Sequence, residues 1–380
     1  MAAIRPALRR FAWPVVIAAL ATALWFGRAE RDLVDFTVYR TAAGRAIDAQ
    51  PLYRPADGHW QFKYLPASAL LLAPFAILPA PVARAAWYGL SVLALVLFVR
   101  LSVSTLPDRQ LGTRALAWLV VLILGRFYIH ELVLGQSNIL LGALLITAVV
   151  AGGRGHAGAA GALVGLAVFV KPYALILLPW LPIAFGWPAL AAAAGVLAAG
   201  LLVPAAAYGW SGNLALHAAW LRTVTDTTAS NLGFPENISL AAMWTRRLGA
   251  GDAARGLTAA SSLAFGAAVA LVLWWRARTR QPAYLEFGLL MLGVALLSPQ
   301  GWDYVLLVAT AAVLTIVNAY GRMGRVWRAL IAPALVVVGF TIFDLLGRTL
   351  YARVMSWSVV TVATLVLVAA LVEVRRTRLA

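Results

Sequence analysis

Residues 114–152 read RALAWLVVLILGRFYIH, then ELVLGQS, then NILLGALLITAVVAG, so two apolar runs enclose one short polar segment. A helix needs about 20 mostly apolar residues to cross the hydrocarbon core of a bilayer, and a few less when its ends snorkel. Because no water reaches that core, each backbone N–H and C=O group must be satisfied within its own segment, which excludes open sheet. The stretch therefore predicts two membrane-spanning helices.

Similar apolar runs recur along the whole chain. Its 380 residues are 63% hydrophobic and 12% charged, whereas about 25% of the residues of a soluble domain are charged. We predict an all-α polytopic membrane protein with about twelve transmembrane helices, in which residues 1–380 form a single integral membrane domain. The predicted spans are residues 11–27, 84–100, 114–130, 138–152, 157–170, 172–187, 188–208, 257–275, 283–297, 302–320, 329–346 and 354–372.

The first apolar run follows three arginines, Arg5, Arg9 and Arg10. A secretory signal peptide has the same order, and the segment 21–23, Ala-Thr-Ala, resembles a cleavage site. The run 11–27 is longer than the apolar core of a usual signal peptide, so we expect it to be an uncleaved first membrane helix.

The basic residues set the expected orientation. The formal net charge is +17, and the arginines gather in short clusters between apolar runs, which is typical of cytoplasmic loops. Nucleic-acid binding explains them less well, because they form no single basic face. One apolar stretch, 67–79, is short and interrupted by prolines, so we predict that it does not cross and forms an interfacial or re-entrant helix on the outer face.

With that choice, both termini and all the main arginine clusters lie on the cytoplasmic side. These clusters comprise Arg9, Arg10, Arg100, Arg109, Arg114, Arg154, Arg276, Arg278, Arg280, Arg322, Arg325, Arg328, Arg375, Arg376 and Arg378.

The same orientation leaves two long outer loops, residues 28–83 and 209–256. Loops of this length on a membrane scaffold are usually functional. In the first loop, apolar residues recur at helical spacing, which predicts a helix lying along the interface. These residues are Phe36, Tyr39, Ala43 and Ile47.

The less common polar residues collect on the predicted outer face. Polar groups at membrane depth are costly and are generally kept for a function, so this clustering predicts a site. The residues are Asp35, Gln136, Ser137, Asn138, Lys171, Asn237, Ser239, Trp302 and Asp303.

Each of these residues also has a purely structural explanation. Asp35 fits a solvated loop carboxylate, and Ser137 or Asn138 fits a helix N-cap. Lys171 fits a side chain that snorkels to the interface. The segment 237–239, Asn-Ile-Ser, matches an N-glycosylation acceptor, and the tryptophan at 302 fits an interfacial aromatic belt.

Several kinds of chemistry are excluded or disfavoured. The chain has no cysteine, so it has no disulfide, thiolate metal site or cysteine nucleophile. The four histidines, at positions 59, 130, 156 and 217, lack the spacing of metal ligands. No glycine-rich phosphate loop follows a predicted strand, so a sugar or phosphate donor would have to come from the membrane. We therefore predict no cofactor and no metal site of the usual histidine or cysteine kind, and a metal requirement stays open.

The order of short motifs along residues 35 to 303 resembles the GT-C-type membrane glycosyltransferases of family 87. That family includes polyprenyl-phosphate-mannose-dependent α-mannosyltransferases and related arabinofuranosyltransferases. The motifs are Asp35-Phe36-x-x-Tyr39, Pro51-Leu52-Tyr53, Phe62-x-Tyr64-x-Pro66, Pro74, Gly135-Gln136-x-Asn138, Lys171-Pro172, Asn237-x-Ser239 and Ser298-Pro299-x-x-Trp302-Asp303.

The resemblance implies a GT-C-like bundle in the plasma membrane of a bacterium, with an extracytoplasmic active site. It implies inverting transfer of a sugar, with mannose as the first candidate, from a polyprenyl-phosphate donor to a glycolipid or glycan acceptor. Asp35 matches the general base, and Lys171 is our first candidate for stabilising the leaving phosphate, followed by Arg31 and Arg40. The implied substrate-binding residues are Tyr39, Tyr64, Gln136, Asn138, Lys171, Asn237, Ser239, Trp302, Asp303 and Tyr304.

One position departs from the family pattern, and two other functions stay open. The Ser-Pro-x-x-Trp-Asp motif often continues with histidine, where this chain has Tyr304, a hydrogen-bond donor without positive charge. A transporter or flippase without glycosyl transfer would need ionisable residues in mid-span, whereas Glu131, Glu286 and Asp344 lie near predicted span ends. The other is an inactive scaffold of the same fold. No protein partner and no nucleic-acid partner is predicted.

Overall fold

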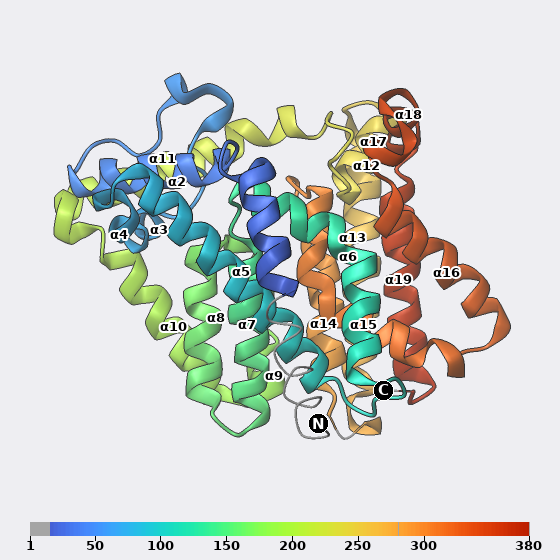
Figure 1. Ribbon diagram of the computed structural model, residues 1–380. Coiled ribbons are helices and arrows are strands. Elements are labelled where there is room, and N and C mark those ends of the chain that lie inside the picture. Colours follow the sequence, from blue (N-terminus) through green and yellow to red (C-terminus); the bar gives the residue numbers. More distant parts are fainter. Residues whose placement is uncertain (1–15, 280, 380) are drawn as a thin grey trace, which may run out of the picture.

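The computed structural model describes residues 16–279 and 281–379 (Figure 1). Within these residues the chain is helical, and its one β-type contact is an isolated bridge between Asn237 and Trp302. The prediction of an all-α polytopic membrane protein is confirmed. The arginines before the first apolar run, the start of that run and Arg280 lie outside the described residues.

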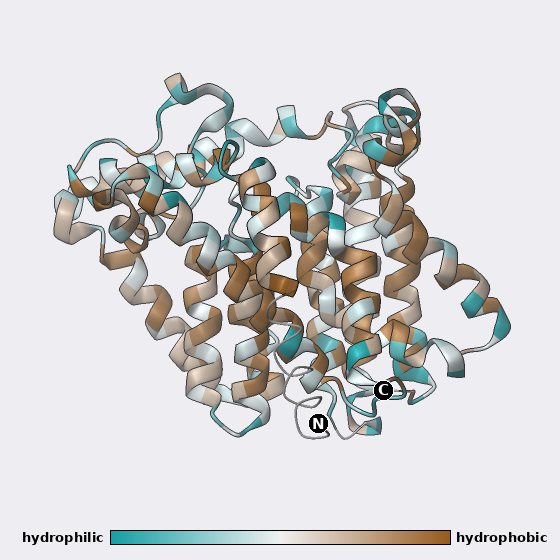
Figure 2. Ribbon diagram, in the orientation of Figure 1, coloured by the Kyte–Doolittle hydropathy of each residue, from teal (hydrophilic) through white to brown (hydrophobic). Residues whose placement is uncertain are grey.

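Long apolar helices form the body of the molecule, and their mid-sections are more apolar than their ends (Figure 2). Four segments are long and apolar enough to cross a membrane: α5 (Ala80–Thr105), α6 (Thr113–Leu134), α13 (Asp252–Trp274) and Asp303–Arg322. The last segment combines the 3-10 helices η5 (Asp303–Ala309) and η6 (Tyr320–Arg322) with α15 (Thr310–Ala319).

Shorter apolar helices run beside them (Figure 1). These are Val16–Ala29, which ends in the π-helix η1 (Trp25–Ala29), α7 (Asn138–Gly153), α8 (Ala157–Val170) and α14 (Ala283–Leu297). Two further helix pairs are each apolar enough to cross as one bent unit: α10 (Trp187–Leu202) with α11 (Ala205–Asn231), bent by 91°, and α18 (Arg348–Ser356) with α19 (Val359–Arg376), bent by 54°. The count of about twelve spans stays a prediction.

Several predicted spans differ from the helices that form. Residues 172–187 are not one helix but η3 (Pro172–Leu177) and α9 (Leu181–Phe185), because prolines in this stretch remove backbone donors. Residues 329–346 divide into α16 (Arg325–Phe340) and α17 (Phe343–Leu346). The predicted span 354–372 starts only with α19, because Ser358 adopts a left-handed conformation that breaks the helix.

The predicted second outer loop is mostly helical. Within the apolar run 188–208, the helix α10 ends at Leu202, and α11 lies at 91° to it and runs along the end of the bundle (Figure 1). Its later part carries Arg222 and Asp226 among several threonines, which suits an interface better than hydrocarbon. A short helix, α12 (Leu240–Leu248), leads into α13.

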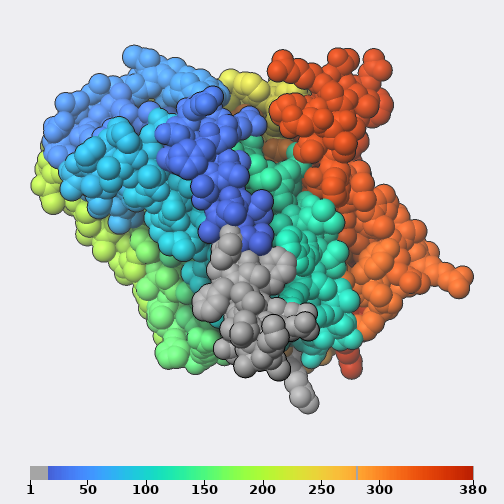
Figure 3. Space-filling view, in the orientation of Figure 1, coloured from blue at the N-terminus to red at the C-terminus, as the bar shows by residue number. Residues whose placement is uncertain are grey.

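One end of the bundle, here called the site end, carries the non-spanning elements (Figure 1). These are α2 (Val34–Ile47), η2 (Pro55–Trp60), α3 (Pro66–Leu71), α4 (Ala73–Ile77), α11, α12, α17 and α18. In Figure 3 the first loop and the segment before α19 project as two lobes of this end, with part of α11 visible between them.

The stretch 67–79 forms two helices of five and six residues, too short to cross a bilayer. They pack against α2 at the site end (Figure 1). Arg40 of α2 donates hydrogen bonds to the carbonyls of Phe75 and Leu78, at 3.1 and 2.9 Å, and so fixes α2 to α4.

The opposite end, here called the arginine end, holds the remaining connections (Figure 1). It comprises the segments 106–112 and 154–156, η4 (Arg276–Arg278), η6 and the C-terminal turn of α19. The arginine clusters predicted to be cytoplasmic therefore lie, where the structure describes them, opposite the non-spanning helices, and the latter carry Arg246 and Arg247 in α12 and Arg348 and Arg353 in α18.

Close helix contact in the bundle depends on small residues. A Cβ atom on Gly161 of α8 would lie 1.8 Å from the carbonyl oxygen of Ala189 on α10, and one on Gly165 would lie 2.9 Å from that of Ala193. These distances leave no room for a side chain, so the two backbones approach as closely as small residues allow in membrane bundles.

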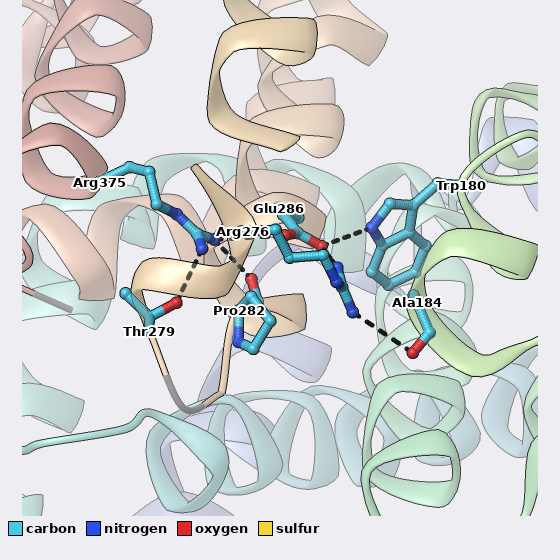
Figure 4. A network of polar contacts seen from close by, with 7 residues as sticks. All are labelled: Trp180, Ala184, Arg276, Thr279, Pro282, Glu286 and Arg375. Atoms are coloured by element: carbon cyan, nitrogen blue, oxygen red, sulfur yellow. Dashed lines mark hydrogen bonds and ion pairs between the residues drawn. The ribbon is translucent and has the colours of Figure 1, made fainter. Parts of the chain in front are cut away.

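A buried carboxylate joins four segments near the arginine end (Figure 4). Glu286 of α14 is 2% exposed, accepts a hydrogen bond from Trp180 Nε1 at 2.9 Å, and pairs with Arg276 and Arg375. Arg375 of α19 is fully buried and also donates to Thr279 Oγ1 at 2.7 Å. The cluster therefore fixes α14 and α19 to the chain near α9 and η4.

Replacing Glu286 by glutamine is expected to destabilise the protein strongly. The change leaves Arg375 buried without its carboxylate, and removing one partner of a buried ion pair costs about 3–5 kcal/mol. Thermal unfolding in a fixed detergent checks this. Asp252→Asn, which removes the same charge from an exposed pair with Arg255, is the matched control and should change the melting temperature little. Equal melting temperatures for the two variants would contradict the assigned role of Glu286.

Candidate active site

Asp35 lies in the first turn of α2, which rests on the connection between α6 and α7. The backbone N–H of Leu33 donates to the carbonyl of Val133 at 2.9 Å, so the start of α2 is tied to the end of α6. Gly135 ends α6 in a left-handed conformation with φ +71°, and a Cβ there would lie 2.8 Å from Phe36 Cβ. Only glycine satisfies both conditions, so it allows α2 to sit directly on this turn.

Gln136 is the centre of the hydrogen-bond network at this turn. Its Oε1 accepts from the Tyr39 hydroxyl at 2.9 Å and from Lys171 Nζ at 2.8 Å. Its side chain also hydrogen-bonds the Asp35 carboxylate. The Tyr39 and Tyr64 hydroxyls lie 2.7 Å apart. Five residues predicted for the site, from four separate segments, therefore meet here.

Burial raises the pKa of the Asp35 carboxyl above its ordinary value of 3.8. The positive charge of Lys171, the hydrogen bond to Gln136, and the nearby His59 and Lys63 act in the opposite direction and lower this pKa. Asp35 is thus a carboxylate with increased proton affinity that cations surround, as suits a general base. His59 and Lys63 had not been singled out for the site from the sequence.

Lys171 is buried inside the site and does not snorkel. Its residue is 5% exposed, and its ammonium group lies 5.6 Å from the Tyr64 ring centre and 5.7 Å from that of Tyr173. It also lies within electrostatic reach of Asp35 and Glu131. A cation in such surroundings can stabilise an anion that forms next to Asp35.

Glu131 is a site residue that the sequence analysis missed. It is fully buried on α6, and its carboxylate accepts from the Asn138 backbone N–H at 3.0 Å and from Asn138 Nδ2 at 2.5 Å. Ser137 occupies the N-cap position of α7, but its side chain makes no capping hydrogen bond. Glu131 therefore does the capping and brings a second negative charge close to Lys171.

The segment after the Ser-Pro turn forms a second polar group. Asp303 Oδ2 pairs with Arg126 Nη1 of α6 at 3.1 Å. Trp302 and Tyr304 stack with ring centres 6.5 Å apart, and the Tyr304 ring centre lies 5.0 Å from that of His130. Tyr304 is also within electrostatic reach of Asp35 and Glu131, so this group borders the network around Gln136. Arg126 and His130 were not predicted as site residues.

Asn237 and Ser239 are fully buried and serve the backbone. Asn237 Nδ2 donates to the Pro299 carbonyl at 2.7 Å, and its Oδ1 accepts from the Ser239 N–H at 3.0 Å. Ser239 Oγ caps α12 by accepting from the Ala242 N–H at 3.1 Å. The Ile238 N–H donates to the Gly301 carbonyl at 2.8 Å. These contacts fix the turn before Trp302, and direct substrate contact by Asn237 and Ser239 stays a prediction.

The two arginines suggested as phosphate ligands differ in their surroundings. Arg40 is engaged with the carbonyls of the α4 segment, and Arg31 is an exposed residue just before α2. Among the described residues, no three histidine or acidic side chains are grouped as a metal site would require. Lys171 is therefore the cation best placed beside Asp35.

Comparison with protein-family models matches residues 62–299, more than half of the chain, to glycosyltransferase family 87. The matched range contains Tyr64, Gln136 and Lys171, whereas Asp35 precedes it and Trp302 follows it. No curated protein and no solved structure matches the chain.

Proposed function

Because the chain belongs to glycosyltransferase family 87, we propose that it transfers a sugar from a polyprenyl-phosphate donor to a glycolipid or glycan acceptor, with inversion and with Asp35 as general base. Family membership indicates a membrane glycosyltransferase that uses a sugar donor and an acceptor. Mannose is the first candidate for the sugar. The described chain contains no β-strand and so no βαβ nucleotide-binding unit, which supports a donor delivered by the membrane.

The observation that carries this proposal is the arrangement of Asp35 and Lys171 on the two sides of Gln136. The acceptor oxygen attacks the anomeric carbon while Asp35 takes the hydroxyl proton. A new carbon–oxygen bond forms, and the bond from the anomeric carbon to the phosphate oxygen breaks. The phosphate leaves with the bonding electron pair, and Lys171 stabilises its negative charge.

Tyr304 and its neighbours supply further donors for the phosphate. The phenol of Tyr304 can donate a hydrogen bond, and His130 places an imidazole against the same ring. This supports a phosphate site in which Tyr304 and His130 together replace the histidine common in the family. The exposed apolar side chains of Leu71 and Ile77, the last residues of the short helices α3 and α4, suit the prenyl chain.

We propose that the site end faces the extracytoplasmic side. The support is the position of the arginine-bearing connections at the opposite end (Figure 1), since such clusters mark the cytoplasmic side. The chain has no cysteine, so a single introduced one reports its own position. In spheroplasts, a membrane-impermeant maleimide is expected to label the exposed site-end variant Asp48→Cys and not the arginine-end variant His156→Cys. Labelling of His156→Cys alone would reverse the orientation.

The activity itself is tested with purified protein in lipid vesicles and radiolabelled polyprenyl-phosphate mannose, with polyprenyl-phosphate arabinose as a second donor. Added membrane lipids and glycans from the source cell serve as acceptors. Label that appears on a glycolipid or glycan in a protein-dependent way supports the proposal. Donor that crosses the bilayer without transfer of label would instead indicate a flippase, and neither event would indicate a scaffold; both results overturn the proposed activity.

A further inference from the structure

A cavity of about 330 Å³ lies between α2 and the segment 57–62, outside the network around Gln136. This volume falls at the lower end of the range for small-molecule sites, about 300–1,000 Å³. The α2 side contributes Thr37, Thr41 and Arg45, which recur at helical spacing, and the loop side contributes Asp57 and Trp60. None of the catalytic steps proposed above uses these side chains.

The cavity lies next to the candidate base along α2, because Val34, the residue before Asp35, lines it. Successive residues of an α-helix are turned by about 100°, so Asp35 lies on α2 between the cavity-lining residues and Tyr39, which contacts Gln136. The loop follows the same path, because its last residue in the cavity wall is Phe62 and it reaches the site two residues later at Tyr64. His59, within this wall segment, and Lys63, directly after it, both lie within electrostatic reach of Asp35.

The lining combines an aromatic face with fixed hydrogen-bonding groups. Trp60 is 49% exposed, so its ring is available to a ligand. Arg45 and Asp57 form a two-pronged ion pair at 2.5 and 2.9 Å, and their side chains are mostly buried. Thr37 and Thr41 line the cavity on the two turns of α2 before Arg45, and the Thr37 hydroxyl donates to the Leu33 carbonyl at 3.1 Å. A sugar ring has an apolar C–H face that packs on an aromatic ring and edge hydroxyls that bind such polar groups.

Building on the proposed function, we infer that this cavity is the acceptor subsite and that it holds a sugar ring stacked on Trp60, with ring hydroxyls bound by Arg45 and Asp57. In an inverting displacement the nucleophile attacks from the side opposite to the leaving group. Lys171, the candidate for the leaving phosphate, lies with Gln136 and Tyr39 on one side of Asp35, and the cavity lies on the other. The acceptor is therefore itself a carbohydrate.

The kinetic test compares Trp60→Ala with the wild type in the labelled-donor assay. Loss of the stacking surface should raise the KM for the acceptor about tenfold and leave the KM for the donor and kcat nearly unchanged. Trp60→Phe should recover most of the affinity. Trp357→Ala, which removes another exposed tryptophan at the site end, is the matched control and should behave as the wild type. An unchanged acceptor KM in Trp60→Ala, with an active wild type, would overturn the subsite and leave the proposed function intact.

A binding test needs no turnover. Saturation-transfer NMR on Asp35→Asn in nanodiscs uses methyl glycosides of mannose, glucose, galactose and arabinofuranose, together with octyl α-D-mannopyranoside. A signal that is present with Asp35→Asn and absent with the double variant that also carries Trp60→Ala supports the subsite, even if no transfer is found. A stronger signal from the octyl glycoside indicates a lipid-linked acceptor, and equal signals indicate a free glycan. If none of the glycosides in the panel gives a signal that depends on Trp60, the inference is overturned.

Discussion

Asp35→Asn is expected to lower kcat for glycosyl transfer by about 10²–10⁴-fold, the usual contribution of a positioned general base. The amide has nearly the same size as the carboxylate and can still hydrogen-bond Gln136, so the network around Gln136 should persist. What it cannot do is accept the proton of the acceptor hydroxyl. Initial rates with saturating donor and acceptor measure the effect, and both KM values should stay close to those of the wild type.

The matched control for that variant is Asp32→Asn. Asp32 lies three residues earlier, pairs with Arg28 at 3.2 Å at the surface, and has no contact with Gln136 in the described chain. It should keep full activity. If Asp35→Asn stays within tenfold of the wild type while inserting normally, another group takes the proton and the assigned mechanism is wrong. If Asp35→Asn and Asp32→Asn lose activity equally, activity depends on the total charge of the first loop, and the assignment of Asp35 as the base is not supported.

The parts of the site that could be predicted lie in loops and at helix ends. Asp35, Tyr39, Gln136 and Lys171 interrupt or follow apolar runs, so their polarity stands out in the sequence. A charge or amide at such a position has few stable surroundings other than an interface or a site. The structure accordingly brings these four side chains into one network.

Three of the residues that were missed lie on α6, and the other two, His59 and Lys63, lie in the first loop. Arg126, His130 and Glu131 occupy the second half of one apolar helix, and sequence alone does not show which side of that helix faces the site. Two of them contact residues far away in the chain: Arg126 pairs with Asp303, and His130 packs on Tyr304. Only the packing of η5 against α6 creates these pairs.

The fold, like the site, has features that the sequence could predict and features that it could not. The prolines around 67–79 indicated correctly that this stretch forms no long helix, because proline removes a backbone donor wherever it occurs. The right-angle turn between α10 and α11 was not foreseen. The apolar run 188–208 continues past this turn, and the polar residues that hold α11 at the interface come only later. Hydropathy along the chain could therefore identify the α10 span but not where it ends.

Lys171→Met is expected to have the second large effect, and it should change both the rate and its pH dependence. Removing the cation nearest to the leaving phosphate should lower kcat by about 10²–10³-fold, as for the loss of one group that stabilises transition-state charge. The pH effect follows from Asp35, which must be ionised to act, so the rate falls as the pH falls through its pKa. Lys171 lowers that pKa, and methionine does not. The acid limb of the kcat/KM profile should therefore move to higher pH.

The neighbours of Asp35 supply the controls for this shift. Besides Lys171, the groups that lower its pKa are Gln136, His59 and Lys63, whereas burial raises it. Lys63→Met should move the acid limb in the same direction but spare more of kcat, since Lys171, and not Lys63, is the lysine that donates to Gln136 beside the proposed phosphate site. Lys171→Arg keeps the positive charge, so its acid limb should lie close to that of the wild type. Its kcat should stay below the wild-type value, because the larger guanidinium cannot reproduce the hydrogen bond to Gln136 in the same space. If the acid limb stays in place in Lys171→Met, Lys171 does not lower the pKa of Asp35. The proposed electrostatic coupling between the general base and the leaving-group site would then be wrong.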